Sequence, residues 1–146
     1  MKIYLDTSAL AKAYLNETGS TEVQRFIALA SNTFISSLNI TEMRCLLARR
    51  ARVGDFTAEI ESRLWSAFQT DVQDEVFELV RLEPSVYTQA AALIDRVAPT
   101  PLRTLDALHL CVAEHLDLNA FITTDKQLAK AARLIGLPVE QLEITQ

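Results

Sequence analysis

Leu105-Asp106-Ala107-Leu108-His109-Leu110 is the stretch on which the predicted organisation of this chain depends. It lies within residues 104–116, where apolar side chains recur at the spacing of an amphipathic helix. On a helical wheel Asp106 falls inside the apolar arc. That arc comprises Leu102, Leu105, Leu110, Val112, Ala113 and Leu116. A carboxylate on the buried side of a helix is strongly destabilising unless a partner neutralises it, so the rest of the chain must supply that partner.

The composition is that of one globular domain. The chain has 146 residues, of which 49% are hydrophobic and 23% are charged. This length is sufficient to bury a substantial core, and we expect a single domain over residues 1–146. The formal net charge of −5 argues against nucleic-acid binding over the whole surface, but it leaves room for a local basic patch.

Cysteines and hydrophobic runs predict a cytoplasmic protein. Cys45 and Cys111 both lie in apolar helical patterns and form no CxxC pair, so we expect two core thiols in a reducing compartment. The N-terminus reaches Asp6 before a signal-peptide hydrophobic region forms. No apolar run approaches the roughly 20 residues that a membrane-spanning helix needs.

Short apolar segments alternate with helical patterns along the whole chain. Because short, mostly apolar strands separated by helices are typical of parallel sheets, we predict an α/β fold, with a short parallel sheet covered by helices on both faces. The predicted strands are residues 2–5, 33–36, 76–80 and 120–123, with a last edge strand within 139–144. The predicted helices are residues 9–19, 21–30, 38–53, 55–69, 86–97, 104–116 and 126–135.

Four acidic residues are predicted to meet at one edge of this sheet. Asp6 directly follows the first strand and Asp125 the fourth, while Glu42 lies in the first turns of the helix after the second strand. Asp106 lies near the start of its own helix and can reach the same edge. Ligands of open α/β sheets bind outside the carboxyl ends of the strands.

Each acid also has a simpler interpretation. Asp6 and Asp125 stand where an aspartate caps a helix, and Glu42 is compatible with a solvated position near a helix N-terminus. Capping does not explain Asp106. Four converging carboxylates would repel one another and raise their own pKa values, unless a countercharge is present. The hard cations Mg²⁺ and Mn²⁺ prefer carboxylate and water oxygens, and we expect one of them here.

Other chemistries find no support in the sequence. The three glycines are scattered, so neither a Walker A loop nor a dinucleotide-binding GxGxxG motif is present, and no GxSxG motif occurs. His109 is predicted to be a core histidine and His115 a surface one, and neither is assigned to a metal. Carboxylate-bound metal without a nucleophilic Ser or Cys indicates metal-assisted attack of water on a phosphate ester.

Positive charge lies near the acids. Arg44, Arg49, Arg50 and Arg52 cluster on and after the helix that carries Glu42. They can flank the acidic site and position a nucleic-acid backbone, or they can form a solvated helical face, and the sequence favours neither. Lys12, Arg103 and Lys126 each lie close to one of the acids and can also contribute.

Four motifs resemble those of the PIN-domain ribonucleases, and more narrowly of the VapC-type toxins of toxin–antitoxin pairs. They are Ile3-Tyr4-Leu5-Asp6-Thr7-Ser8-Ala9-Leu10, Ile35-Ser36-Ser37-Leu38 with Glu42, Leu102-Arg103-Thr104-Leu105-Asp106-Ala107-Leu108-His109-Leu110, and Thr123-Thr124-Asp125. The resemblance implies a three-layer α/β/α sandwich, a Mg²⁺- or Mn²⁺-dependent endoribonuclease, a homodimer and a cognate antitoxin. The family's acidic quartet maps onto Asp6, Glu42, Asp106 and Asp125, and Ser8 matches a small polar position of the same pocket.

The leading hypothesis is therefore an RNA endonuclease. Asp6 and Asp106 would hold the metal most directly, with Asp125 and Glu42 completing the site. One alternative is a non-catalytic PIN-like module that binds RNA or a protein. Another is a phosphoryl-accepting regulatory domain, which would need its aspartate at the end of a central strand, whereas Asp106 is predicted to lie in a helix.

Overall fold

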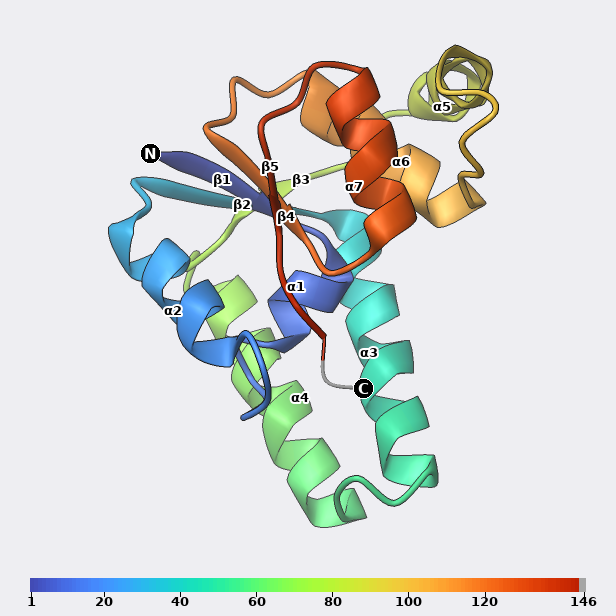
Figure 1. The fold of residues 1–146 in the computed structure, drawn as a ribbon. Helices are drawn as coiled ribbons and strands as arrows, with labels where there is room; N and C mark the ends of the chain where they lie inside the picture. Colours follow the sequence, from blue (N-terminus) through green and yellow to red (C-terminus); the bar gives the residue numbers. More distant parts are fainter. Residues whose placement is uncertain (145–146) are drawn as a thin grey trace.

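A five-stranded, fully parallel sheet forms the centre of the molecule in the computed structural model, which describes residues 1–144. The strand order is β3-β2-β1-β4-β5 (Figure 1). The strands are β1 (Lys2–Leu5), β2 (Asn32–Ser36), β3 (Glu78–Val80), β4 (Ala120–Thr123) and β5 (Val139–Gln141). The predicted parallel α/β architecture is confirmed.

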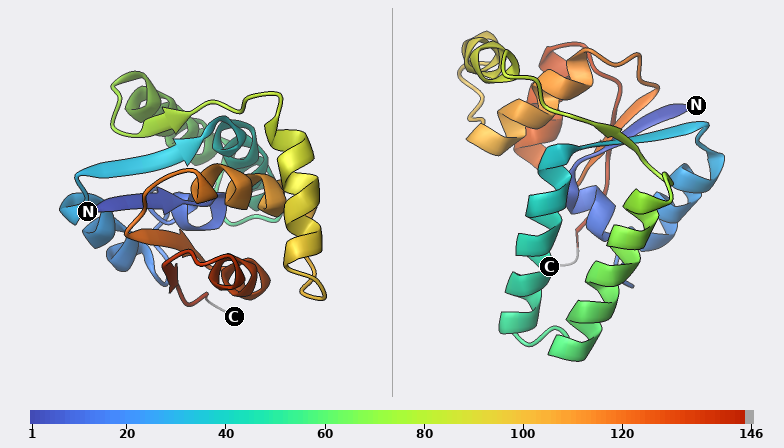
Figure 2. Two further views of the ribbon diagram at one scale, coloured as in Figure 1. Left: turned by 90° about the horizontal axis from the view of Figure 1, so that it is seen from above. Right: turned by 180° about the vertical axis from the view of Figure 1, so that it is seen from behind.

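Among residues 1–144, seven helices cover the two faces of the sheet and complete a three-layer sandwich (Figures 1 and 2). On one face lie α1 (Thr7–Ala11), α2 (Ser20–Leu29), α3 (Ser37–Arg52) and α4 (Ala58–Gln73), and on the other lie α5 (Val86–Arg96), α6 (Thr104–Glu114) and α7 (Lys126–Leu134). The α3–α4 hairpin extends well beyond the sheet (Figure 2). None of the helices among residues 1–144 is long and apolar enough to cross a membrane.

The central strand β1 divides the core into two halves. Ile3, Tyr4 and Leu5 are completely buried. Successive side chains of a strand point to opposite faces, so Ile3 and Leu5 pack among α1–α4 whereas Tyr4 packs against α5, α6 and α7. Strand β1 pairs with both β2 and β4. This central position fixes where Asp6, the next residue, leaves the sheet.

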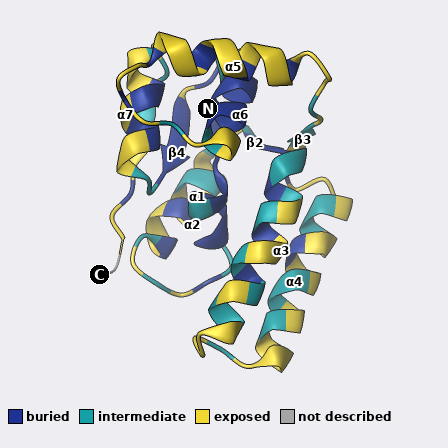
Figure 3. Cartoon of the chain, turned by 90° about the vertical axis from the view of Figure 1, so that its right-hand side faces the viewer, coloured by how far each residue is buried: buried dark blue, intermediate teal, exposed yellow. Residues whose placement is uncertain are grey.

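Helix α6 contains the sequence stretch with the misplaced carboxylate. It is buried over the seven residues 107–113, between α5 and the sheet (Figure 3). The predicted apolar arc was wrong at Leu105, which is 45% exposed. Leu105 and Asp106 lie in the first turn, where the helix passes the rim of the sheet and its side chains reach a pocket instead of the core.

The region between β1 and α2 differs from the prediction. The helix expected over residues 9–19 is only the five-residue α1, followed by turns. Asp6 caps its start by accepting a hydrogen bond from the Ala9 amide. Gly19, which was expected to end that helix, is instead the N-cap residue of α2 with a φ of 90°. The left-handed conformation available to glycine allows the sharp entry into α2.

Candidate metal and phosphate site

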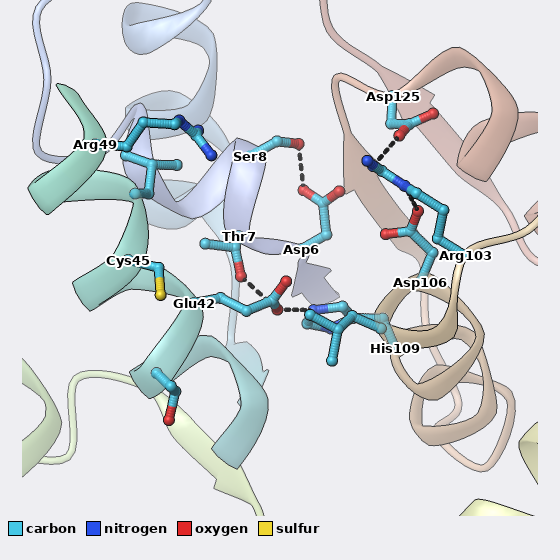
Figure 4. A pocket seen from close by; sticks show the side chains of 13 residues that line it. Asp6, Thr7, Ser8, Glu42, Cys45, Arg49, Arg103, Asp106, His109 and Asp125 are labelled. Atoms are coloured by element: carbon cyan, nitrogen blue, oxygen red, sulfur yellow. Dashed lines mark hydrogen bonds and ion pairs between the residues drawn. The ribbon is translucent and has the colours of Figure 1, made fainter. Parts of the chain in front are cut away.

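A pocket of about 370 Å³ opens at the carboxyl ends of β1 and β4, between α3 and α6. Figure 4 shows its side chains, which come from four separate segments of the chain. Its lining comprises Asp6, Thr7, Ser8, Thr41, Glu42, Cys45, Leu46, Arg49, Arg103, Leu105, Asp106, His109 and Asp125. All four acids singled out in the sequence thus line one pocket.

Asp6 is the most deeply placed carboxylate, with only 5% of the residue exposed. One oxygen, Oδ1, accepts hydrogen bonds from the Ser8 hydroxyl at 2.7 Å and the Ala9 amide at 2.9 Å. The other, Oδ2, accepts one from the Thr123 hydroxyl at 2.5 Å. Burial raises the pKa of Asp6, although these hydrogen bonds oppose the shift. The carboxylate is therefore rigidly oriented, and a nearby positive charge would favour its ionised form.

Asp106 and Asp125 share one guanidinium group. Nε of Arg103 lies 3.3 Å from Oδ2 of Asp106, and its Nη2 lies 3.2 Å from Oδ2 of Asp125 (Figure 4). Burial raises the pKa of Asp106, Arg103 opposes the shift, and the charge of Asp125 adds to it. Asp125 also caps α7, since its Oδ1 accepts hydrogen bonds from the amides of Gln127 and Leu128. Its capping role and its place in the pocket coexist.

Glu42 is held from two sides through a single oxygen. Its Oε1 accepts a hydrogen bond from the Thr7 hydroxyl at 2.9 Å and lies 2.5 Å from Nε2 of His109 (Figure 4). Burial opposes ionisation, but the contacts with His109 and Thr7 prevail and lower the pKa of Glu42. Among residues 1–144 no donor is recorded for Oε2 of Glu42. That oxygen remains available for a ligand.

Only part of the predicted basic cluster reaches this pocket. Arg49 lines it. Arg44 instead pairs with Glu61 and lies over the ring of Trp65, and Arg50 pairs with Glu17 and Asp55.

Of the three basic side chains predicted to lie near the acids, only one lies in the pocket. Lys12 is buried and donates to Glu17 and to the carbonyl of Thr18. Lys126 lines a different hollow, beside β5. Arg103 alone of these three lies in the pocket with the carboxylates.

Among the pocket residues that the sequence did not assign to the site, His109 and Cys45 carry groups that can take part in its chemistry. His109 is buried, as predicted for a core histidine, but its Nε2 edge faces Glu42. Cys45 was expected in the core and is instead exposed, one turn after Glu42 on the wall of the pocket. The available signal was the spacing along each helix, since His109 lies three residues after Asp106 and Cys45 three residues after Glu42. Residues three positions apart share a helix face.

The carboxylate and hydroxyl oxygens of the pocket are the ligand atoms that a hard divalent cation prefers. Four carboxylates face two guanidinium groups, which leaves an excess of negative charge. As the side chains lie, however, no three His, Cys, Asp or Glu residues within 1–144 form a group that could hold a metal ion. Arg103 lies between two of the carboxylates and supplies the countercharge there.

A family model described as PIN domain matches residues 3–134. The chain belongs to the PIN-domain family. The resemblance inferred from the sequence motifs is thus confirmed over most of the chain.

Curated relatives of this PIN domain carry the name ribonuclease. Ribonuclease VapC46 of Mycobacterium tuberculosis (strain ATCC 25618 / H37Rv) is 31% identical over 140 residues, which cover 94% of this chain and 95% of the relative. Ribonuclease VapC47 of M. tuberculosis (strain CDC 1551 / Oshkosh) is 29% identical over 140 residues and 92% of each chain. The similarity therefore extends over nearly the full length of both relatives.

A solved structure supports the fold. VapBC2 from Rickettsia felis, bound to a DNA fragment from its promoter, includes a chain that aligns with a TM-score of 0.67 at 14% sequence identity. The alignment covers 98% of this PIN domain and 100% of that chain.

Proposed function

We propose that this PIN domain is a Mg²⁺- or Mn²⁺-dependent endoribonuclease and the toxin of a toxin–antitoxin pair. The observation that carries the proposal is the convergence of Asp6, Glu42, Asp106 and Asp125 in one pocket. The ribonuclease names of two relatives that align over almost the whole chain support the same activity. The excess of carboxylates supports a cation as the cofactor.

Each side chain has a definite task in this proposal. Asp6, fixed by three hydrogen bonds, and Asp106 would hold the cation most directly, while Asp125 and Glu42 complete its surroundings. A divalent cation bound there would supply an acidified water and neutralise charge developing on the scissile phosphate. Thr7 and His109 hold Oε1 of Glu42, which leaves Oε2 to face the cation or its hydration shell.

The partners proposed are RNA, a cognate antitoxin and a second copy of the chain, all in the cytoplasm. The arginine on the α3 wall, Arg49, would contact the RNA backbone. A homodimer agrees with the exposed apolar side chains of α5, where Tyr87 is 60% and Ile94 39% exposed. Sedimentation of the purified chain tests the dimer, and co-purification with the product of a small adjacent gene tests the antitoxin.

Sequencing of RNA ends after controlled expression tests the activity in cells. Wild type is compared with Asp6→Asn, which keeps the size of the side chain but removes its charge. We expect new RNA ends that accumulate at defined sites with wild type only. Equal accumulation of the same ends with Asp6→Asn would contradict the proposal.

The alternative is a PIN-like module that binds RNA or protein without cleaving it. It predicts that purified wild type retains RNA but produces no cleavage across titrations of Mg²⁺ and Mn²⁺. That pattern would replace the enzymatic proposal with a binding function.

A further inference from the structure

Arg103 occupies an unusual position for a positively charged residue. It is the N-cap residue of α6, and its side chain makes no capping hydrogen bond. Instead the guanidinium group reaches across the pocket rim and bridges Asp106, on α6, to Asp125, at the start of α7. It thereby satisfies the two acids that a metal would otherwise join.

The contacts of Arg103 with Asp106 and Asp125 are weak enough to be broken easily. The side chain of Arg103 is 82% exposed, and its two contacts, at 3.3 and 3.2 Å, are at or beyond the long end of the usual range for such hydrogen bonds. Exposed ion pairs of this kind contribute little to stability, because water and salt screen them. Three of the five N–H groups of the guanidinium have no recorded acceptor among residues 1–144.

A divalent cation that binds Oδ2 of Asp106 and Oδ2 of Asp125 would compete with the guanidinium, because Arg103 contacts these same two oxygens. Mg²⁺ needs carboxylate oxygens at about 2.0–2.1 Å, and two positive groups this close repel strongly. A cation that takes these two oxygens would therefore displace Arg103. A freed guanidinium at the rim of this pocket has the fork of donors that matches a phosphate.

We infer that Arg103 is a phosphate-binding residue of the site, and that it reaches the RNA phosphate only after a divalent cation has taken over Asp106 and Asp125. This inference rests on the proposed function. Without metal, the single charge of Arg103 partly neutralises the two acids. With metal, the same side chain moves from carboxylate to phosphate, so cofactor binding and substrate binding are coupled through one residue.

Arg49 provides a matched control. It lines the same pocket from the α3 wall, and no ion pair joins it to a carboxylate within residues 1–144. Its removal lowers the positive charge of the pocket by the same amount as removal of Arg103. A change seen only in the Arg103 variant therefore reports competition for the two carboxylates, not general electrostatics.

The test is calorimetric titration of Mn²⁺ into purified wild type, Arg103→Gln and Arg49→Gln without RNA, followed by RNA cleavage at saturating Mn²⁺. We expect Arg103→Gln to bind Mn²⁺ about three- to tenfold more tightly than wild type, and Arg49→Gln to differ less than about twofold. We also expect Arg103→Gln to cleave RNA at least about tenfold more slowly despite its tighter metal binding.

Unchanged or weaker Mn²⁺ binding by Arg103→Gln, or tighter binding with an unchanged cleavage rate, would overturn the role of Arg103. Equal tightening in both variants would also overturn it. The proposed function fails in a different way, namely if wild type binds no Mn²⁺ or if Asp106→Asn binds it as tightly as wild type.

Discussion

Nε2 of His109 lies 2.5 Å from Oε1 of Glu42, across the space between α6 and α3. On the other side of the ring, Nδ1 lies 2.6 Å from the hydroxyl of Tyr4, a completely buried residue of β1. Burial raises the pKa of Tyr4, so its hydroxyl stays protonated and can donate to Nδ1. Because a carboxylate only accepts, Nε2 donates to Glu42. The core thus orients a side chain of the pocket through His109.

Two substitutions of His109 test its contact with Glu42 and its contact with Tyr4 separately. In His109→Gln the amide nitrogen can replace Nε2 and keep the bond to Glu42, whereas in His109→Asn the amide can replace Nδ1 and keep only the contact with Tyr4. His109→Gln leaves the buried Tyr4 hydroxyl without this partner, and His109→Asn removes one of the two partners of Oε1 of Glu42. We expect each to lose about 1–3 kcal/mol of unfolding free energy. Cleavage should fall much further in His109→Asn, because Glu42 is then held only by Thr7.

Urea denaturation and cleavage rates, measured on the same preparations, check this prediction. His115→Gln is the control, since His115 lies on the exposed side near the end of α6 and contacts Gln89. It should change neither quantity appreciably. Equal losses of activity in the two His109 variants would show that the contact with Glu42 has no special role.

Stability without metal should depend on the ionisation of Asp6. Its pKa is raised above the ordinary value of 3.8 in the folded protein. The stability contributed by the neutral carboxyl is fully present below pH 3.8 and is lost as the pH rises through the raised pKa. Wild type should therefore lose stability relative to Asp6→Asn as the pH rises through that window, by about 1.4 kcal/mol for each unit of the shift.

Urea denaturation in EDTA at several pH values measures this difference, with the exposed Asp95→Asn as control. Addition of Mn²⁺ at neutral pH should stabilise wild type more than Asp6→Asn, because the cation binds the folded wild type preferentially. A stability difference between wild type and Asp6→Asn that stays constant with pH would contradict the role of burial at this site.

Gly19→Ala tests the turn that leads into α2. Gly19 has a φ of 90°, and a Cβ added there would lie 3.0 Å from Cδ of the buried Lys12. Gly136 has a φ of 88° but open space around it. We expect Gly136→Ala to cost about 1–2 kcal/mol from backbone strain alone. Gly19→Ala should cost more, since Lys12 must also shift, and equal costs in thermal or urea unfolding would show that the contact is unimportant.

The sequence predicted the architecture well because its signals are local. Apolar runs end sharply at Asp6 and Asp125, and strands that end together in a parallel sheet bring such residues to one edge. Glu42 and Asp106 follow from the helical phase of their own segments. The same reasoning is enough to place four distant acids in one pocket.

The sequence was least informative where a side chain has several neighbours with which it could interact. Arg44 and Arg50 were candidates for RNA contact, but acids on α4 and in neighbouring loops take both of them. Cys45 has an apolar helical pattern around it, yet its face of α3 borders the pocket and not the core. Helical periodicity gives the direction of a side chain but not what lies opposite.

The partner of Asp106 illustrates the same limit. The sequence predicted a shared metal for this acid, whereas its partner in the structure is Arg103, three residues earlier in the same segment. Arginine is long and flexible enough to turn back over the first turn of α6. In the proposed mechanism the metal and Arg103 are alternative partners of one carboxylate, which is a relationship that no single sequence position reveals.

Cleavage of a labelled RNA by purified protein is the most direct test of the proposed site. The RNA spans a site found by end sequencing, and wild type, Asp106→Asn and Asp95→Asn are compared in Mn²⁺ and in EDTA, with circular dichroism to verify folding. We predict that wild type and Asp95→Asn cleave in Mn²⁺ only, and that folded Asp106→Asn is slower by at least about 100-fold. Cleavage in EDTA, or wild-type rates in folded Asp106→Asn, would contradict a metal-dependent nuclease built on this carboxylate.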